Sequence, residues 1–184
     1  MATEAVMLTV LIELQENRYV AVIDIPNTFI QTKVEDKKYM VTIRVRGEPV
    51  QTLLDIAPKV YKPYVTKDNK GNLILLLWWL NAIYGTMIAG LLFYKKFRKT
   101  LIREGFEINS YDPCVANKMV NGKQQTICWH VDDCKLSHRD KRVNGRFILV
   151  LKEEYKCIFK DGSGQMTVSC RKIHDYLGMT LDYT

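Results

Sequence analysis

Two predicted hairpins share one strand, and that strand ends in two adjacent acids. Asn121-Gly122 separates residues 111–120 from residues 123–131, and Asn-Gly is the strongest short signal for a two-residue hairpin turn. The second of these strands is rich in Ile, Trp and Val and stops at Asp132-Asp133, after which residues 134–138 form a returning strand. We therefore expect both acids in a turn at the exposed end of an antiparallel sheet.

The two acids allow two interpretations. Asp is a common turn residue, so the pair fits a solvated hairpin turn. Two like charges side by side also repel, so the pair fits a site for a divalent metal if a third carboxylate lies nearby. Residues 19–23 form a β-branched apolar strand that stops at Asp24, just before Pro26. Asp24 is thus a candidate third ligand, or it caps the following turn.

Periodicity and turn residues predict the other elements of the first half. Met7, Leu11 and Leu14 indicate the buried face of an N-terminal helix, with Thr3 as its cap. We also expect a charged hairpin over residues 33–49, a loop over residues 47–71, and a buried strand, or the start of a helix, over residues 73–80.

A basic amphipathic helix is predicted over residues 86–104, ended by Gly105. Its polar face contains Lys96, Lys99 and Arg103. Such a face is either solvated or in contact with the phosphates of a nucleic acid, and the sequence does not separate these alternatives.

The C-terminal third predicts a second helix and two strands. Asp140 is the expected cap of a helix in which Val143, Phe147 and Leu151 recur every four residues. A loop over residues 161–164 and strands over residues 166–172 and 176–183 follow. The order of elements predicts an α+β fold, in which an antiparallel sheet has helices packed on one face.

Composition narrows the class of protein. The chain has 184 residues, 47% of them hydrophobic, which suits one domain with a real core. No apolar run is long enough to span a bilayer, and no signal peptide is recognisable, so we expect no membrane partner. The five cysteines form no Cys-x-x-Cys pair, which suits a reducing, intracellular compartment, cytoplasmic or nuclear. The net charge of +7 is compatible with a polyanionic partner.

Residues 20–31, 82–85, 129–133 and 175–181 form four motifs in a fixed order. Together they resemble the copia-type retrotransposon reverse transcriptases. Residues 20–31 resemble the first catalytic motif of that family, and residues 82–85 resemble its Ala-Leu-Tyr-Gly segment. Residues 129–133 resemble the Tyr-x-Asp-Asp catalytic turn, and residues 175–181 resemble the Phe-Leu-Gly-Met strand that follows the palm.

The resemblance implies the palm of an RNA-directed DNA polymerase, a nucleotidyltransferase that extends a primer by two-metal phosphoryl transfer. Residues 1–184 would be a single palm domain with a partial fingers insertion near residues 33–80. Asp24, Asp132 and Asp133 would bind Mg²⁺, or Mn²⁺, because hard carboxylate oxygens suit these ions. The implied partners are an RNA or DNA template-primer, deoxynucleoside triphosphates and other segments of a retrotransposon polyprotein.

The resemblance also assigns binding residues. Phe29 stands where the family places an aromatic ring under the incoming sugar, although ordinary core packing also explains a Phe there. Leu177, Gly178 and Met179 match the strand that leads to the primer-gripping region, and with Lys96, Lys99 and Arg103 they form the expected nucleic-acid contacts. The expected nucleotide contacts are Phe29, Ile25, Tyr84, Gly85 and His130.

Departures from the family leave two other hypotheses open. His130 replaces the Tyr of the catalytic turn, and Ile88 replaces a Gln that contacts template or nucleotide. By the resemblance, the N-terminal part of the fingers and the thumb lie outside this chain. One alternative is therefore an inactive retroelement-derived fragment that at most binds nucleic acid. The other is a metal-dependent hydrolase in which His130 and Asp132, two apart on a strand, share one ion with Asp133.

Overall fold

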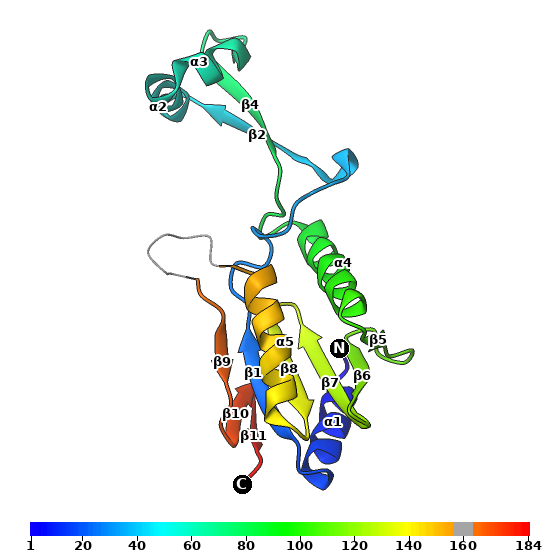
Figure 1. Ribbon diagram of the computed structural model, residues 1–184. Coiled ribbons are helices and arrows are strands. Elements are labelled where there is room, and N and C mark those ends of the chain that lie inside the picture. The colour runs from blue at the N-terminus through cyan, green and yellow to red at the C-terminus, as the bar shows by residue number, and fades with distance from the viewer. Residues whose placement is uncertain (157–163) are drawn as a thin grey trace.

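The main sheet of the computed structural model has six antiparallel strands in the order β5-β6-β7-β8-β1-β9 (Figure 1). The structure describes residues 1–156 and 164–184. Asn121 and Gly122 have φ angles of 51° and 72°, so the predicted two-residue hairpin turn is confirmed. The strands are β5 Glu107–Ile108, β6 Val115–Val120, β7 Lys123–His130, β8 Asp133–His138, β1 Tyr19–Asp24 and β9 Thr167–Ser169.

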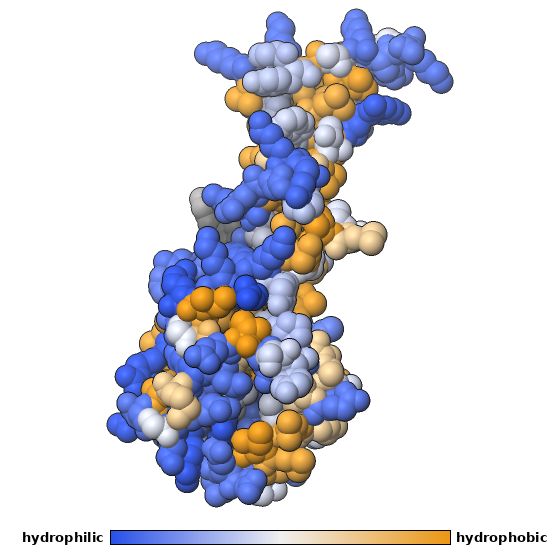
Figure 2. All heavy atoms as spheres, turned by 90° about the vertical axis from the view of Figure 1, so that its right-hand side faces the viewer, coloured by the Kyte–Doolittle hydropathy of each residue, from blue (hydrophilic) through white to orange (hydrophobic). Residues whose placement is uncertain are grey.

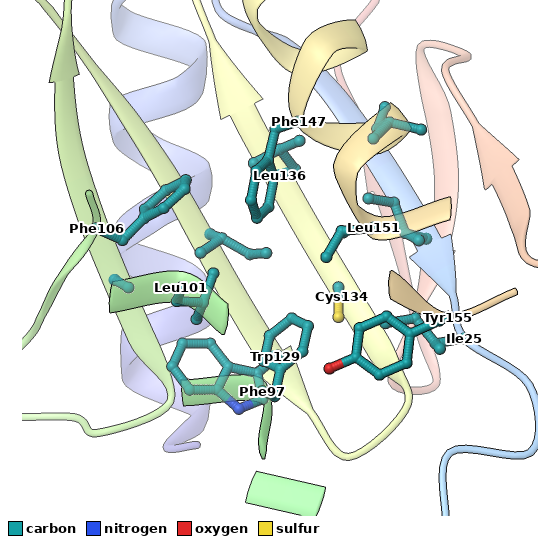
Figure 3. Close-up of a cluster of buried hydrophobic side chains, with 14 of the residues drawn as sticks. Ile25, Phe97, Leu101, Phe106, Trp129, Cys134, Leu136, Phe147, Leu151 and Tyr155 are labelled. Carbon is teal, nitrogen blue, oxygen red and sulfur yellow. The ribbon is translucent and has the colours of Figure 1, made fainter. Parts of the chain in front are cut away.

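Helices α4 (Met87–Arg103) and α5 (Lys141–Glu154) pack on one face of this sheet. Both were predicted, and Asp140 caps α5 as expected by accepting a hydrogen bond from the Arg142 amide at 2.9 Å. Aromatic rings fill the space between helices and sheet, with Phe97 centred 5.4 Å from Trp129 (Figure 3). The core residues drawn there include Leu101, Phe106, Cys134, Leu136, Phe147, Leu151 and Tyr155.

The opposite face of the sheet is covered by helix α1 (Thr3–Gln15) and the hairpin of β10 (Ile173–Tyr176) and β11 (Met179–Asp182). The antiparallel α+β fold is therefore as predicted, but its helices occupy both faces rather than one. The prediction of a single C-terminal strand over residues 176–183 is wrong, because this part of the chain contains the turn of a hairpin. Leu177 and Gly178, with φ angles of 51° and 75°, turn the chain between β10 and β11.

Helix α1 exposes the face that periodicity predicted to be buried. Leu11 is 63% exposed, and Met7 and Leu14 are exposed too, whereas Val6, Thr9 and Glu13 are buried. Thr3 does not cap the helix, because the N-cap is Ala2 and makes no side-chain hydrogen bond. The helix buries the face that carries Val6, Thr9 and Glu13, because the sheet places a charged partner for Glu13 beneath it.

That partner is Lys135 of β8. Its ammonium group donates to both carboxylate oxygens of Glu13, at 2.5 and 2.6 Å, and to the Thr9 hydroxyl at 3.1 Å. Tyr183 donates to the same carboxylate at 2.6 Å. Both charged side chains are buried, so the ion pair ties α1 and the C-terminal end of the chain to the sheet. A buried pair this well hydrogen-bonded is tolerated in the interior, but neither partner is tolerated alone.

A second sheet, in the order β2-β4-β3, lies apart from the main one with α2 and α3 (Figure 1). Residues 33–49 do not form the predicted hairpin, because β2 pairs with β4, about thirty residues further on. The loop predicted over residues 47–71 is also wrong. Pro49 and Pro58 stand in the first turns of helices, where proline is tolerated. The elements are η1 Lys37–Tyr39, β2 Val41–Arg46, α2 Glu48–Ile56, α3 Pro58–Tyr61, η2 Lys62–Tyr64, β3 Val65–Lys67 and β4 Leu73–Trp79.

Residues 73–79 form strand β4, which is one of the two predicted alternatives, but the strand is largely exposed and not buried as expected. Only Leu75 is buried, whereas Trp78 is 60% exposed. Helix α2 covers one face of this small sheet and buries Val50, while the other face is open. Hydrophobic atoms of this unit reach the surface in Figure 2.

Two features of the sequence fall wholly or largely outside the described residues. The loop over residues 161–164 lies outside the described residues except for Gly164, and so does Cys157. No helix within the described ranges is long and apolar enough to cross a membrane.

The buried ion pair gives a stability prediction. Glu13→Gln is expected to lower the free energy of unfolding by about 3 kcal/mol, because the Lys135 ammonium stays buried without a counter-charge. Urea denaturation measures the loss. Glu153→Gln, which breaks an exposed pair with Lys156, should cost less than about 1 kcal/mol. The double variant Glu13→Leu/Lys135→Met should recover much of the loss, and a double variant as unstable as the single one would contradict the argument.

Candidate active site

The sheet aligns three of the predicted site residues in one row. His130 of β7 lies directly opposite Asp133 of β8, and Asp133 lies directly opposite Asp24 of β1. Residues directly opposite in antiparallel strands share a face. The next row, with Trp129, Cys134 and Ile23, is buried and packs in the core against α4 and α5, so the row of acids faces away from these helices.

Asp132 stands in the turn between β7 and β8. Its carbonyl oxygen accepts a hydrogen bond from the Ile25 amide at 3.0 Å, which ties the turn to the end of β1. Val131 has a φ of 53°, a conformation that β-branched residues rarely adopt and that glycine usually takes in a turn of this kind. Val131 is thus a strained residue in the turn that brings the acids of two strands to one end of the sheet. Strained backbone conformations of this kind cluster at functional sites.

Two of the three carboxyl groups have perturbed acidities. Burial raises the pKa of Asp24, and the charge of Asp132 raises it further. Burial also raises the pKa of Asp133, with added repulsion from Asp132 and Asp24, while His130 opposes the rise. The three acids therefore repel one another at close range, and a cation among them would relieve that repulsion.

The donor set suits a hard divalent cation. Carboxylate oxygens are the ligands that Mg²⁺ and Mn²⁺ prefer, and the mutual repulsion of the acids favours a positive ion. Within residues 1–156 and 164–184, no three side chains of His, Cys, Asp or Glu already stand together as a metal site. A bound ion would therefore have to draw the side chains of Asp24, Asp132 and Asp133 inward from their present positions.

The residues predicted to contact a nucleotide differ in their exposure to solvent. The Phe29 ring is centred 4.7 Å from the Tyr84 ring, and Tyr84 is half exposed. Gly85 follows with a φ of 82°, one residue before the N-cap of α4. Ile25 differs, because its side chain is fully buried in the helix-side core and its amide is bonded to Asp132. Ile25 thus positions the turn and offers no side chain to a ligand.

His130 is exposed at the end of β7. The hydrolase hypothesis required it to share a face with Asp132, and that geometry is wrong because the turn at Val131 interrupts the alternation of the strand. His130 instead stands opposite Asp133. The row also continues to Thr167 of β9, opposite Asp24. Thr167 falls in the strand predicted over residues 166–172, but no feature of the sequence marked it as a neighbour of the acids.

The remaining predicted contacts fall on two sides of the sheet. Leu177, Gly178 and Met179 belong to the β10–β11 hairpin, which packs on the same face as the row of acids. Its neighbour Tyr176 donates a hydrogen bond to the Cys128 carbonyl at 3.4 Å, two residues before His130. Lys96 and Lys99 lie instead on α4, behind the sheet, and Arg103 there is paired with Glu104 and Glu154.

Comparison with known proteins shows the class of fold. The sequence matches no family model and no curated protein. The structure of apo telomerase from Candida tropicalis matches with a TM-score of 0.51 and 10% identity, covering 99% of this chain and 35% of that one. Telomerase from Candida albicans, in complex with a TWJ fragment of telomeric RNA, matches with a TM-score of 0.47 and 10% identity, covering 98% and 34%. The fold is thus similar to that of part of the Candida tropicalis telomerase chain. The chain spans about a third of the length of the telomerase chains it matches.

The raised pKa values of Asp24 and Asp133 predict how stability depends on pH. A carboxyl group with a raised pKa binds its proton more tightly in the folded state, so the stability of the metal-free protein should fall as pH rises through and above the ordinary carboxyl range. Asp24→Asn should remove part of this loss and raise stability at neutral pH by about 0.5 kcal/mol after solvent screening.

Thermal unfolding of metal-free protein between acid and neutral pH measures this effect. Asp55→Asn, an exposed acid of α2 outside the main sheet, is the matched control and should change little. An Asp24→Asn protein less stable than the wild type at neutral pH would show that the acids do not repel one another as argued.

Proposed function

We propose that this chain is the palm of an RNA-directed DNA polymerase of the copia type, which adds deoxynucleotides to a primer by phosphoryl transfer. The observation that supports it most is the pairing of Asp24 with Asp133, with Asp132 in the adjoining turn. Three acidic residues from segments about a hundred residues apart thus lie at the same end of one sheet, within a fold similar to part of a telomerase chain. Two-metal nucleotidyl transfer requires such a set.

In this proposal Asp24, Asp132 and Asp133 hold Mg²⁺ or Mn²⁺. Bound ions would supply Lewis-acid activation of the attacking hydroxyl and would neutralise charge on the triphosphate. The chain contributes position: the β1–β8 register fixes Asp24 against Asp133, and the Ile25 amide holds the turn that presents Asp132. In the absence of a metal, the pKa values of Asp24 and Asp133 are raised. This is the behaviour of carboxyl groups that lack a positive partner and that a cation would stabilise.

The proposal assigns the sugar and base of the nucleotide to Phe29 and Tyr84. Their rings are in contact, and Phe29 also lies 6.5 Å from Phe93 of α4, centre to centre. This packing gives Phe29 a fixed orientation, which a residue that screens the 2′ position of a sugar needs. Its ring is half-buried, so core packing and substrate contact are both served.

The small sheet of β2, β4 and β3 is, in this proposal, the part of the fingers that this chain contains. It joins the palm through two connections, residues 25–40 and 80–86 (Figure 1). The proposed partners are a template-primer, deoxynucleoside triphosphates and other segments of a retrotransposon polyprotein.

An inactive relative that only binds nucleic acid is the second candidate function. Ile88, in the first turn of α4, offers no polar group where the family has Gln. The absence of a ready-made three-ligand metal group among the described residues favours the same alternative.

Metal binding tests the site without requiring turnover. Titration with Mn²⁺, followed by electron paramagnetic resonance, should show saturable binding to the wild type. The Asp24→Asn/Asp132→Asn double variant should bind at least about 10-fold more weakly, because two of three charged ligands are gone. Asp55→Asn should bind like the wild type. Equal Mn²⁺ affinity in all three proteins would refute the assignment of the site.

Primer extension then separates the two candidate functions. An active palm should extend a DNA primer on an RNA template with Mg²⁺ or Mn²⁺, and Asp132→Asn/Asp133→Asn should abolish extension. Tight Mn²⁺ binding without any extension, including when the remaining polymerase segments are added in trans, would favour the inactive nucleic-acid-binding protein.

A further inference from the structure

We infer that a basic cleft on the helix side of the molecule binds the phosphate backbone of a single-stranded nucleic acid. The cleft has a volume of about 550 Å³ and lies between α4, the end of α5 and residues 31–39. The inference rests on the nucleic-acid partner of the proposed function and deepens it, because it assigns that partner a cleft behind the sheet that uses none of the carboxylates of the candidate active site. Its cationic lining residues are Lys33, Lys38, Lys95, Lys96, Lys99 and Arg103.

Most of this positive charge has no counter-charge. The cleft also contains three acids, and two of them are engaged: Glu154 pairs with Arg103 at 2.9 Å, and Asp36 pairs with Lys38 at 3.1 Å. Lys33, Lys95 and Lys99 form no ion pair with any residue that the structure describes. An uncompensated group of cations in a concave surface attracts a polyanion.

Lys96 is the most informative of these cations because it is half-buried. Its ammonium group donates to the Gln31 carbonyl at 3.0 Å and lies 4.7 Å from the centre of the Tyr155 ring. Burial lowers its pKa, which the charge of Glu154 only partly offsets. The part of the chain that the structure describes supplies no carboxylate within ion-pair distance of Lys96. A phosphate in the cleft would provide the missing counter-charge.

The spacing of the cations suits a linear ligand. Lys95, Lys99 and Arg103 follow one another at intervals of four residues, which places them about 6 Å apart along α4. Arg103 is already neutralised, so the effective row consists of Lys95, Lys96 and Lys99. Lys95 and Lys99 stand about one helical turn apart, with Lys96 between them in sequence, so the row can contact more than one phosphate of an extended chain.

An aromatic ring adds a surface for a base. Tyr39 lines the cleft, with the Lys38 ammonium 4.6 Å and the Lys95 ammonium 6.0 Å from its ring centre. Aromatic rings flanked by cations bind single strands, because every base can stack on the ring while the cations hold the backbone. A double helix buries its bases and could not use this ring.

The test compares two triple variants that remove equal charge. Lys95→Gln/Lys96→Met/Lys99→Gln removes the row, with Met chosen to keep the packing of residue 96 over Tyr155. Lys59→Gln/Lys62→Gln/Lys67→Gln removes three cations from the small-sheet unit, outside the cleft. The probe is a fluorescent single-stranded RNA of about 12 nucleotides, and anisotropy is measured in EDTA over a range of salt.

We expect the cleft variant to bind at least about 10-fold more weakly at low salt, with the slope of log affinity against log salt reduced in magnitude by about 2. The control triple should lose less than about 2-fold in affinity. Tyr39→Ala should weaken binding of the single strand but not of a duplex of the same length. Equal losses in both triple variants would show diffuse attraction rather than a site and would overturn the inference.

Further measurements keep the result unambiguous. Circular dichroism and thermal unfolding establish that the cleft variant is folded, and the single variants Lys95→Gln and Lys99→Gln, both exposed, should each lose part of the affinity. Inorganic triphosphate that binds as tightly as the RNA would overturn the assignment to a nucleic acid. The Asp24→Asn/Asp132→Asn variant should bind the RNA in EDTA like the wild type, so failure of the cleft and failure of the candidate active site are distinguishable.

Discussion

The pairing of β1 with β8 is the constraint on which the rest of this protein depends. Its register sets Asp24 against Asp133 and, one row away, Ile23 against Cys134. A slip of one residue would turn the acids toward the helices and the apolar row toward solvent. The rings of Phe97, Trp129 and Tyr155 (Figure 3) make that slip costly. Packing on one face of the sheet thereby fixes the chemistry available on the other.

The face opposite α4 and α5 is polar along much of its length, and its two ends are used differently. Lys135, two residues after Asp133 on the same face, is buried beneath α1 and neutralised by Glu13. Asp133, by contrast, forms no ion pair with any residue that the structure describes. The ion pair holds the helix in place, and the uncovered acids remain free to bind a cation.

The two proposed ligand sites lie on opposite sides of the main sheet. The acids accept metal ions and repel phosphate, whereas the cleft beside α4 is lined with cations that attract it. Helix α4 borders both the cleft and the candidate nucleotide contacts, since its N-terminal end follows Tyr84 and Gly85 and its polar face lines the cleft. A nucleic acid held in the cleft would thus contact the same helix that borders the candidate nucleotide site.

The sequence by itself determined the local elements whose signals are short-range. The Asn121-Gly122 turn, the Asp140 cap, the strand ending at Asp24 and the two helices of the main core all follow from neighbouring residues. It also supplied the three acids as a hypothesis. Only the tertiary structure decided that β2 pairs with β4, that α1 turns Glu13 inward, and that Lys96 faces a cleft. Each of these depends on a partner far away in the chain, and local periodicity holds no information about such partners.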